Sequence, residues 1–207
     1  MKALASLALT ATLALALPTL AAPALAQDDH VAPEPVASQV SLEDGLSAWN
    51  QIHEVFSHPR CANCHVGEDN IPRWSGPHYG DEPRNHGMFV NGDDSRFGVE
   101  SITCTTCHAT ENAQVLHGPP GAEVWMLAPV EFVWWEKTSQ EICEQVKDPE
   151  RNGFRSIEDL AHHVEFDALV LWGWNPGPGR EPAPYSASEL ASFVRTWGAA
   201  GAPCPAG

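Results

Sequence analysis

Two five-residue segments of the same form constrain this chain of 207 residues more than any other feature. They read Cys-Ala-Asn-Cys-His at 61–65 and Cys-Thr-Thr-Cys-His at 104–108. Two thiols separated by two residues can both reach the vinyl groups of one porphyrin, and the next histidine can then bind its iron. Because both copies carry this histidine, the pattern predicts two covalent haem c groups rather than a zinc site or redox dithiols. The predicted attachment residues are Cys61, Cys64, Cys104 and Cys107, and the proximal iron ligands are His65 and His108.

Residues 1–26 have the form of an export signal. Lys2 gives a short positive start, a run of alanine and leucine follows, and Ala-Leu-Ala at 24–26 offers a cleavage site. We expect cleavage there rather than an uncleaved anchor, then a flexible lead-in at 27–40 and one domain at 41–207. Haem attachment to such motifs takes place outside the cytoplasm. The two signals together predict a soluble periplasmic protein that does not span the membrane once the signal is removed.

The charge balance limits the partners. The chain has 27 Asp and Glu against 11 Lys and Arg, a formal net charge of −16. This charge excludes nucleic acid as a partner, because binding to phosphates needs clustered cations. It favours redox protein partners with a basic docking face, although the acidity also serves solubility. Arg151, Arg155 and Arg180 are scarce cations that could pair with haem propionates.

Two of the six cysteines remain outside the haem motifs. Cys143 and Cys204 form one pair in a chain expected to reach an oxidising compartment, so we predict a disulfide between them. The alternative is two free structural thiols.

Helical periodicity, capping residues and prolines predict an all-α domain. Long loops rich in glycine and proline, at 66–98 and 172–185, would wrap around the two haems. A helix before the first motif and another at the C-terminus resemble the cytochrome c arrangement, and Gly45 could receive Trp197 where they cross. The expected helices start at Ser41 and stop before Pro59, run over 139–147 and 156–166, and start at Ser186 and stop at Gly198. Several tryptophans of the second half are expected to be ordinary core, with packing against porphyrin faces as the alternative: Trp125, Trp134, Trp135, Trp172 and Trp174.

The distal ligands of the irons are the open question, because they set the reduction potential and decide whether an iron has a free position. For the first haem we favour His86, with Met88 as its rival. For the second we favour Met126, then His163, then His117. Each of these residues is separated from a motif by enough chain to turn over a haem.

Helical phase separates two neighbouring histidines in the segment 156–166. The apolar stripe of this predicted helix contains Leu160 and Val164. At about 100° per residue, His163 lies at the edge of that stripe and His162 points away from it. We therefore expect His163 to reach an interior haem and His162 to face solvent.

Two further segments carry a narrower resemblance. They are Ile-Cys-Glu-Gln-Val-Lys-Asp-Pro-Glu-Arg-Asn-Gly at 142–153 and Leu-Val-Leu-Trp-Gly-Trp-Asn-Pro-Gly-Pro-Gly-Arg at 169–180. The chain is similar to a family of secreted bacterial dihaem cytochromes labelled isoquinoline 1-oxidoreductase subunits. The resemblance implies an electron-transfer subunit that accepts electrons from a molybdenum hydroxylase-type dehydrogenase. No molybdopterin or iron–sulfur motif occurs in the sequence, so the chain is not expected to be the catalytic subunit.

The motifs therefore predict a periplasmic dihaem carrier of single electrons rather than an enzyme. The alternative is a dihaem peroxidase-like enzyme with one open haem iron. This chain is short for the two-domain build of such enzymes, and potential iron ligands are plentiful in it.

Overall fold

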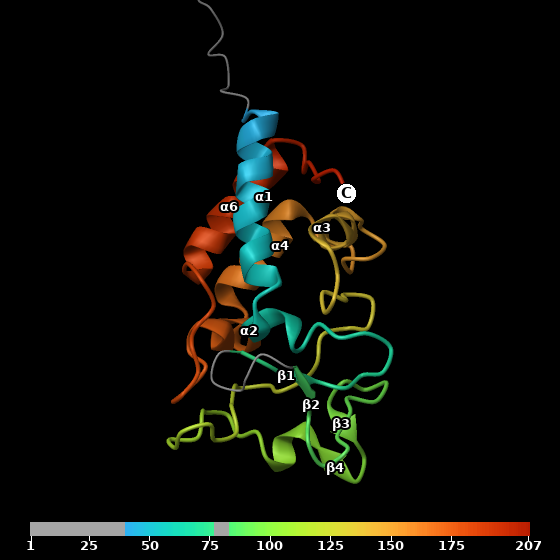
Figure 1. Ribbon diagram of the computed structural model, residues 1–207, viewed down its shortest axis with the longest axis vertical. Coiled ribbons are helices and arrows are strands. Elements are labelled where there is room, and N and C mark those ends of the chain that lie inside the picture. Colours follow the sequence, from blue (N-terminus) through green and yellow to red (C-terminus); the bar gives the residue numbers. More distant parts are fainter. Residues whose placement is uncertain (1–39, 77–82) are drawn as a thin grey trace, which may run out of the picture. The chain divides into compact units, whose positions relative to one another are not determined.

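The computed structural model describes residues 40–76 and 83–207, and these residues form a mostly helical unit (Figure 1). The predicted export signal and nearly all of the lead-in lie outside the described residues. Of the helices that are described, none is long and apolar enough to cross a membrane. The helices are α1 (Leu42–Phe56), α2 (Pro59–Ala62), α3 (Ser139–Lys147), α4 (Ile157–Phe166), α5 (Ala168–Leu171) and α6 (Ala187–Ala199), with 3-10 turns at Cys104–Thr106 and Trp172–Trp174.

Capping boxes start the four longer helices. At the start of each, a serine or threonine side chain accepts a hydrogen bond from the backbone three residues later, and the acid at that position bonds back to the backbone of the cap. The pairs are Ser41 with Asp44, Thr138 with Glu141, Ser156 with Asp159, and Ser186 with Glu189. Since these signals are local, the predicted helices at 139–147 and 156–166 are confirmed to within one residue.

Pro59 has a different role from the one expected of it. The first helix ends at Phe56, and Pro59 begins the short helix α2, where its missing N–H is not needed. His58 caps this helix by accepting a hydrogen bond at Nδ1 from the backbone N–H of Arg60 (3.2 Å). Helix α2 carries Cys61, so a proline at its first position sets where the first motif begins.

The core is built where α1 and α6 cross (Figure 1). Trp49 and Trp197 are fully buried there, with ring centroids 5.2 Å apart. The terminal helices therefore pack together as predicted, but the predicted pair is wrong. Gly45 faces Ala200 and Pro203 just beyond α6, whereas Trp197 packs against Trp49 one turn along α1.

Gly198 does not stop the last helix. The helix continues to Ala199, and Gly201 follows with φ of 85°, the left-handed conformation common just after a helix. A side chain at Gly198 would collide with Ile157 at the start of α4. Gly198 therefore permits the close approach of α6 to α4.

Two short strand pairs occur in a chain predicted to be all-α. Strand β1 (Arg73–Trp74) pairs antiparallel with β2 (Arg84–Asn85), and β3 (Gly98–Val99) pairs antiparallel with β4 (Ile102–Thr103). Strand β4 leads directly into the 3-10 turn at Cys104–Thr106. The second motif is thus positioned by a tight strand pair, whereas the first is positioned by a helix.

The predicted disulfide between Cys143 and Cys204 is present. Their Cα atoms are 5.6 Å apart, and the bond joins α3 to the segment after α6. Cys143 is fully buried in the core. The bond therefore ties the C-terminal end of the chain to the helical core.

We expect Gly45→Ala to destabilise the protein by about 1–2 kcal/mol, because overpacking outweighs the better helix propensity of alanine. A Cβ at this position would lie 2.9 Å from Cγ of Pro203 and closer still to Cβ of Ala200. Denaturant unfolding of the holoprotein measures the change. Gly67→Ala is the control, since nothing lies within 4 Å of its Cβ. Equal stability of the two variants would contradict this packing.

Replacing both Cys143 and Cys204 by alanine is expected to lower the free energy of unfolding by about 4 kcal/mol. The bond spans 61 residues, and the chain-entropy model assigns roughly that value to a loop of this length. The measurement is denaturant unfolding of the oxidised protein. Either single variant breaks the same bond and should lose a similar amount. A loss under about 1 kcal/mol would show that the C-terminal segment is held by packing instead.

Candidate functional site

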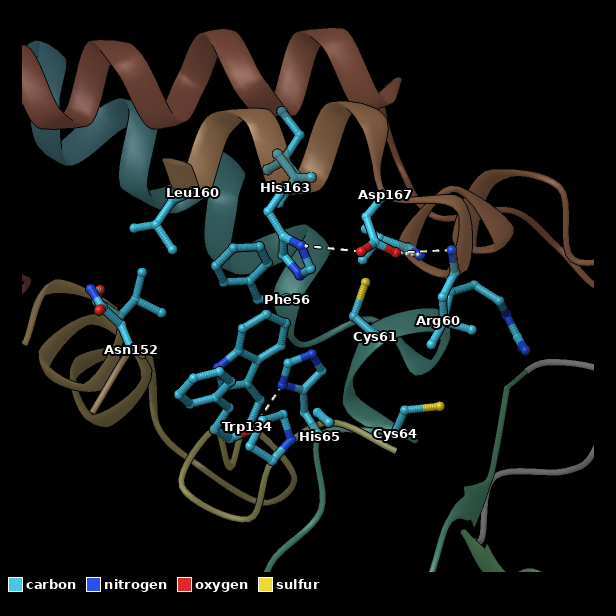
Figure 2. A pocket seen from close by; sticks show the side chains of 18 of the residues that line it. Phe56, Arg60, Cys61, Cys64, His65, Trp134, Asn152, Leu160, His163 and Asp167 are labelled. Atoms are coloured by element: carbon cyan, nitrogen blue, oxygen red, sulfur yellow. Dashed lines mark hydrogen bonds and ion pairs between the residues drawn. The ribbon is translucent and has the colours of Figure 1, made fainter. Parts of the chain in front are cut away.

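The first motif opens onto a cavity of about 380 Å³ between α2 and α4 (Figure 2). This volume lies within the range of roughly 300–1,000 Å³ that is usual for sites of small molecules and cofactors. Cys61, Cys64 and His65 line one side, and His163 enters from α4. The rest of the lining is mainly apolar and aromatic. The cavity therefore brings together one complete motif and a second histidine.

The ring of His65 is held by two contacts. Its Nδ1 donates a hydrogen bond to the carbonyl of Phe132 (2.8 Å), and its ring stacks on Trp134 with centroids 3.5 Å apart and planes 1° apart. Phe56 of α1 stacks on Trp134 in turn (4.1 Å). Because a carbonyl can only accept, the proton resides on Nδ1 and Nε2 keeps its lone pair. Burial lowers the pKa of His65 to about 4, so the ring is neutral at pH 7, the form that binds metals.

His163 faces the same cavity, and its neighbour His162 does not. His163 lines the cavity, whereas His162 is exposed, as the helical phase predicts. Nδ1 of His163 lies 3.5 Å from Oδ2 of Asp167. Burial lowers the pKa of His163, and a charge on it would lower the pKa of His65, so the two rings are close enough to interact.

The second motif opens onto a separate cavity of about 290 Å³, lined by Cys104, Cys107 and His108. Nδ1 of His108 donates to the carbonyl of Pro120 (2.7 Å), and its ring stacks on Trp125 with centroids 4.5 Å apart. The arrangement repeats that of the first motif: a backbone carbonyl binds Nδ1 and a tryptophan covers one face of the ring. Each proximal histidine is therefore oriented by a carbonyl and an indole.

His86 lies across the second cavity from His108. Their ring centroids are 6.2 Å apart, and Nδ1 of His86 donates to the carbonyl of Gly87 (2.9 Å). A metal–nitrogen bond is roughly 2 Å long, and the nitrogen lies about 1.2 Å from the centre of the imidazole ring. Two imidazoles on opposite sides of one metal therefore have ring centroids about 6 Å apart. The spacing of this pair therefore matches that of two axial ligands on one iron.

The two cavities share a wall. Cys64 of the first motif lines both cavities, and its thiol interacts electrostatically with that of Cys104 in the second motif. The other residues that line both are Arg60, Trp125, Met126, Leu127 and Trp172. Groups held in the two cavities would thus be separated by one layer of side chains.

Cations gather at the cavities of this acidic chain. Five arginines line them, out of 11 lysines and arginines in all: Arg60, Arg73, Arg96, Arg155 and Arg180. Arg151 lines neither cavity. Guanidinium groups bind carboxylates well, so these arginines suit the propionates of a haem.

Arg60 is the most enclosed of these cations. It is buried, it donates to Oε1 of Glu181 (3.1 Å) and to the carbonyl of Ser75 (3.2 Å), and its Nε has no hydrogen-bond partner within the described part of the chain. Its guanidinium lies 5.8 Å from the ring of Trp172. A buried donor with spare capacity in the wall between two cavities fits an anionic group bound there.

The structure rearranges the predicted distal ligands. His86, expected at the first motif, lies in the second cavity, together with its rival Met88. His163, an alternative for the second motif, lies in the first cavity. His117 lines the second cavity, and Met126 lines both.

The strand pair β1–β2 explains why His86 lies in the second cavity rather than in the first. His86 directly follows β2, and its backbone N–H donates to the carbonyl of Pro72 (2.9 Å). This ladder carries the ring away from the first motif and toward the second. Chain length between two residues limits how far a side chain can reach, but it does not set the direction.

Sequence reasoning missed the tryptophans that stack on the histidines. Trp134 is far from His65 in the sequence, and no pattern links them. Likewise, no pattern links Trp125 to His108. These tryptophans line the cavities, as Trp172 and Trp174 do, while Trp134 and Trp174 also pack against the helical core as expected. Asp167 could have been found, because it lies four residues after His163, where helical side chains meet.

Among the described residues, no group of three or more His, Cys, Asp and Glu side chains is placed to hold a metal ion. A haem iron takes only two ligands from the protein, so a facing pair is sufficient for it. Comparisons with protein-family models, with curated proteins and with solved structures found no match to this chain.

Proposed function

We propose that this chain is a dihaem c-type cytochrome with a cytochrome c-like fold, which carries single electrons between redox partners. The observation that carries the proposal is the pairing in each cavity: one Cys-x-x-Cys-His motif faces a second histidine across the space. A zinc site needs three or four ligating side chains close together, and no such group occurs among the described residues. A dithiol exchanger needs no second histidine.

The residues present fit two haem c groups. Cys61, Cys64, Cys104 and Cys107 would form the thioether bonds. His65 with His163 would bind the first iron, and His108 with His86 the second. Each iron supplies a reversible one-electron couple. The chain holds the imidazoles by Nδ1 so that Nε2 is presented, lines the cavities with apolar groups that exclude water, and places arginines for the propionates.

The shared wall favours electron transfer between the two groups. Cys64 would bind the first haem while lining the cavity of the second. Electrons could then pass between the haems without a large structural change. The second motif lies nearer the surface, since Thr105, Thr106 and Cys107 are exposed. The edge of the second haem is thus the contact point we propose for an outside partner.

A carrier agrees better with these cavities than the peroxidase-like alternative. Chemistry at iron needs an open coordination position. In the second cavity the distance between His86 and His108 would suit two ligands on one iron, and in the first cavity His163 would serve as the second ligand. Two six-coordinate irons leave no position for peroxide.

We propose that this carrier is periplasmic, because the predicted export signal and the chemistry of haem attachment both imply that location. Its electron donor would be a molybdenum hydroxylase-type dehydrogenase, as the family resemblance of 142–153 and 169–180 implies. The acidic surface suits a donor or acceptor with a basic docking face.

Optical and low-temperature EPR spectra of the holoprotein test the proposal. We expect two covalent haems per chain by mass, both irons low-spin, and no uptake of carbon monoxide or peroxide at either. Such spectra also show whether sulfur binds an iron, through the sulfur-to-iron band. A high-spin iron that takes up peroxide would favour the peroxidase-like enzyme. A chain that carries no covalent haem would refute both the carrier and the enzyme.

Substitution of the distal histidines tests the pairing. We expect His163→Ala to make the first iron high-spin and open to carbon monoxide, and His86→Ala to do so at the second. Added imidazole should restore the low-spin spectra, because it replaces the missing ligand. The matched control is His162→Ala, since His162 is the exposed neighbour of His163. A low-spin first iron in His163→Ala would assign its ligand elsewhere, with Met126 next in line.

A further inference from the structure

Asp167 stands apart in the linings of the two cavities. The chain has 27 Asp and Glu residues, yet Asp167 is the one carboxylate among the described residues that line either cavity. The other charged side chains in these linings are arginines, and three of them line the same cavity as Asp167: Arg60, Arg96 and Arg155. A lone anion in a cavity with three arginines therefore calls for a specific role.

Both carboxylate oxygens of Asp167 make contacts. Oδ1 accepts hydrogen bonds from the backbone N–H groups of Leu169 (2.9 Å) and Val170 (3.2 Å) and so caps α5. Oδ2 faces Nδ1 of His163 at 3.5 Å (Figure 2). Because the cap fixes the carboxylate, Oδ2 is held in place beside the imidazole by backbone that does not depend on any ligand.

Three of the other four histidines that line the cavities, the proposed iron ligands His65, His108 and His86, have neutral acceptors at Nδ1. These acceptors are the backbone carbonyls of Phe132 for His65, of Pro120 for His108 and of Gly87 for His86. Among the four proposed iron ligands, His163 is the one whose Nδ1 faces a carboxylate. A carboxylate at this position makes an imidazole a more basic metal ligand than a carbonyl does. A more basic ligand stabilises the ferric iron over the ferrous iron and lowers the reduction potential.

We propose that Asp167 is a positioning residue of the first haem site, which turns Nε2 of His163 toward the cavity and lowers the reduction potential of the first iron. This inference rests on the proposed function. The contact favours the oxidised state at the first haem and so biases electrons toward the second haem, whose distal His86 has only a carbonyl partner. This difference between the two sites would favour electron transfer from the first haem to the second.

Asp167→Asn tests the proposal without removing the cap. The amide oxygen can still accept hydrogen bonds from the backbone N–H groups of Leu169 and Val170, whereas the amide nitrogen cannot accept a hydrogen bond from Nδ1 of His163. We expect the midpoint potential of the first haem to rise and that of the second to stay unchanged, with the EPR signal of the first haem shifted. The measurement is a potentiometric titration followed optically and by EPR. The low-spin signal that survives in His86→Ala identifies the first haem.

Glu43→Gln is the control for the loss of one negative charge. Glu43 lies exposed in the first turn of α1 and lines neither cavity. We expect both potentials of this variant to match those of the unaltered protein. Thermal unfolding of Asp167→Asn shows whether the fold is kept. If Asp167 had only a structural role, the substitution would lower the thermal stability without shifting the potential of the first haem alone.

Three results would overturn the inference. The first is a potential of the first haem that moves no more in Asp167→Asn than in Glu43→Gln, and the second is an equal shift at both haems. The third is a sulfur-to-iron band assigned to the first iron of the unaltered protein, which would leave the dihaem carrier standing without His163 as a ligand. A chain without covalent haem would instead refute the proposed function itself.

Discussion

The packing of α6 against both α1 and α4 is the contact on which the first site depends. Helix α1 leads into α2 and the first motif, and α4 carries His163, so these two parts of the site meet only because one helix packs against both. Trp197 packs on Trp49 of α1, and Gly198 lets α6 approach Ile157 of α4. The core therefore sets the distance across the first cavity, and a change in helix packing would be felt at the proposed iron ligands.

The two cavities are built by different means around the same chemistry. Helices supply most of the first, and short strand pairs and loops supply the second. In both, a carbonyl binds Nδ1 of the motif histidine and an indole stacks on its ring, although the residues come from unrelated places in the chain. This repeated solution reflects one requirement: a neutral imidazole whose Nε2 is free and whose ring cannot turn. The difference lies in the distal partner, where a carboxylate faces one histidine and a carbonyl the other.

Local signals predicted much of the fold. Capping boxes at Ser156 and Ser186 act within one turn, so the helices start where the sequence places them. The disulfide also followed from the sequence, because two cysteines remained once the motifs were assigned. The failures concern contacts between distant parts of the chain. Pro59 starts a helix rather than only ending one. Gly198 serves helix packing rather than helix termination. The effect of a proline or glycine on the backbone depends on the elements beside it.

The sequence by itself determined the two motifs, their six cysteine and histidine side chains and the acidic charge of the chain, because these are properties of adjacent residues and of composition. It also determined, through helical phase, that His163 and not His162 faces inward. The tertiary structure alone decided which second histidine shares a cavity with which motif. The ladder of β1 with β2 turns His86 toward His108, and the packing of α4 brings His163 to His65. Direction in space comes from long-range backbone pairing and core packing, and neither can be obtained from the number of residues that separate two side chains.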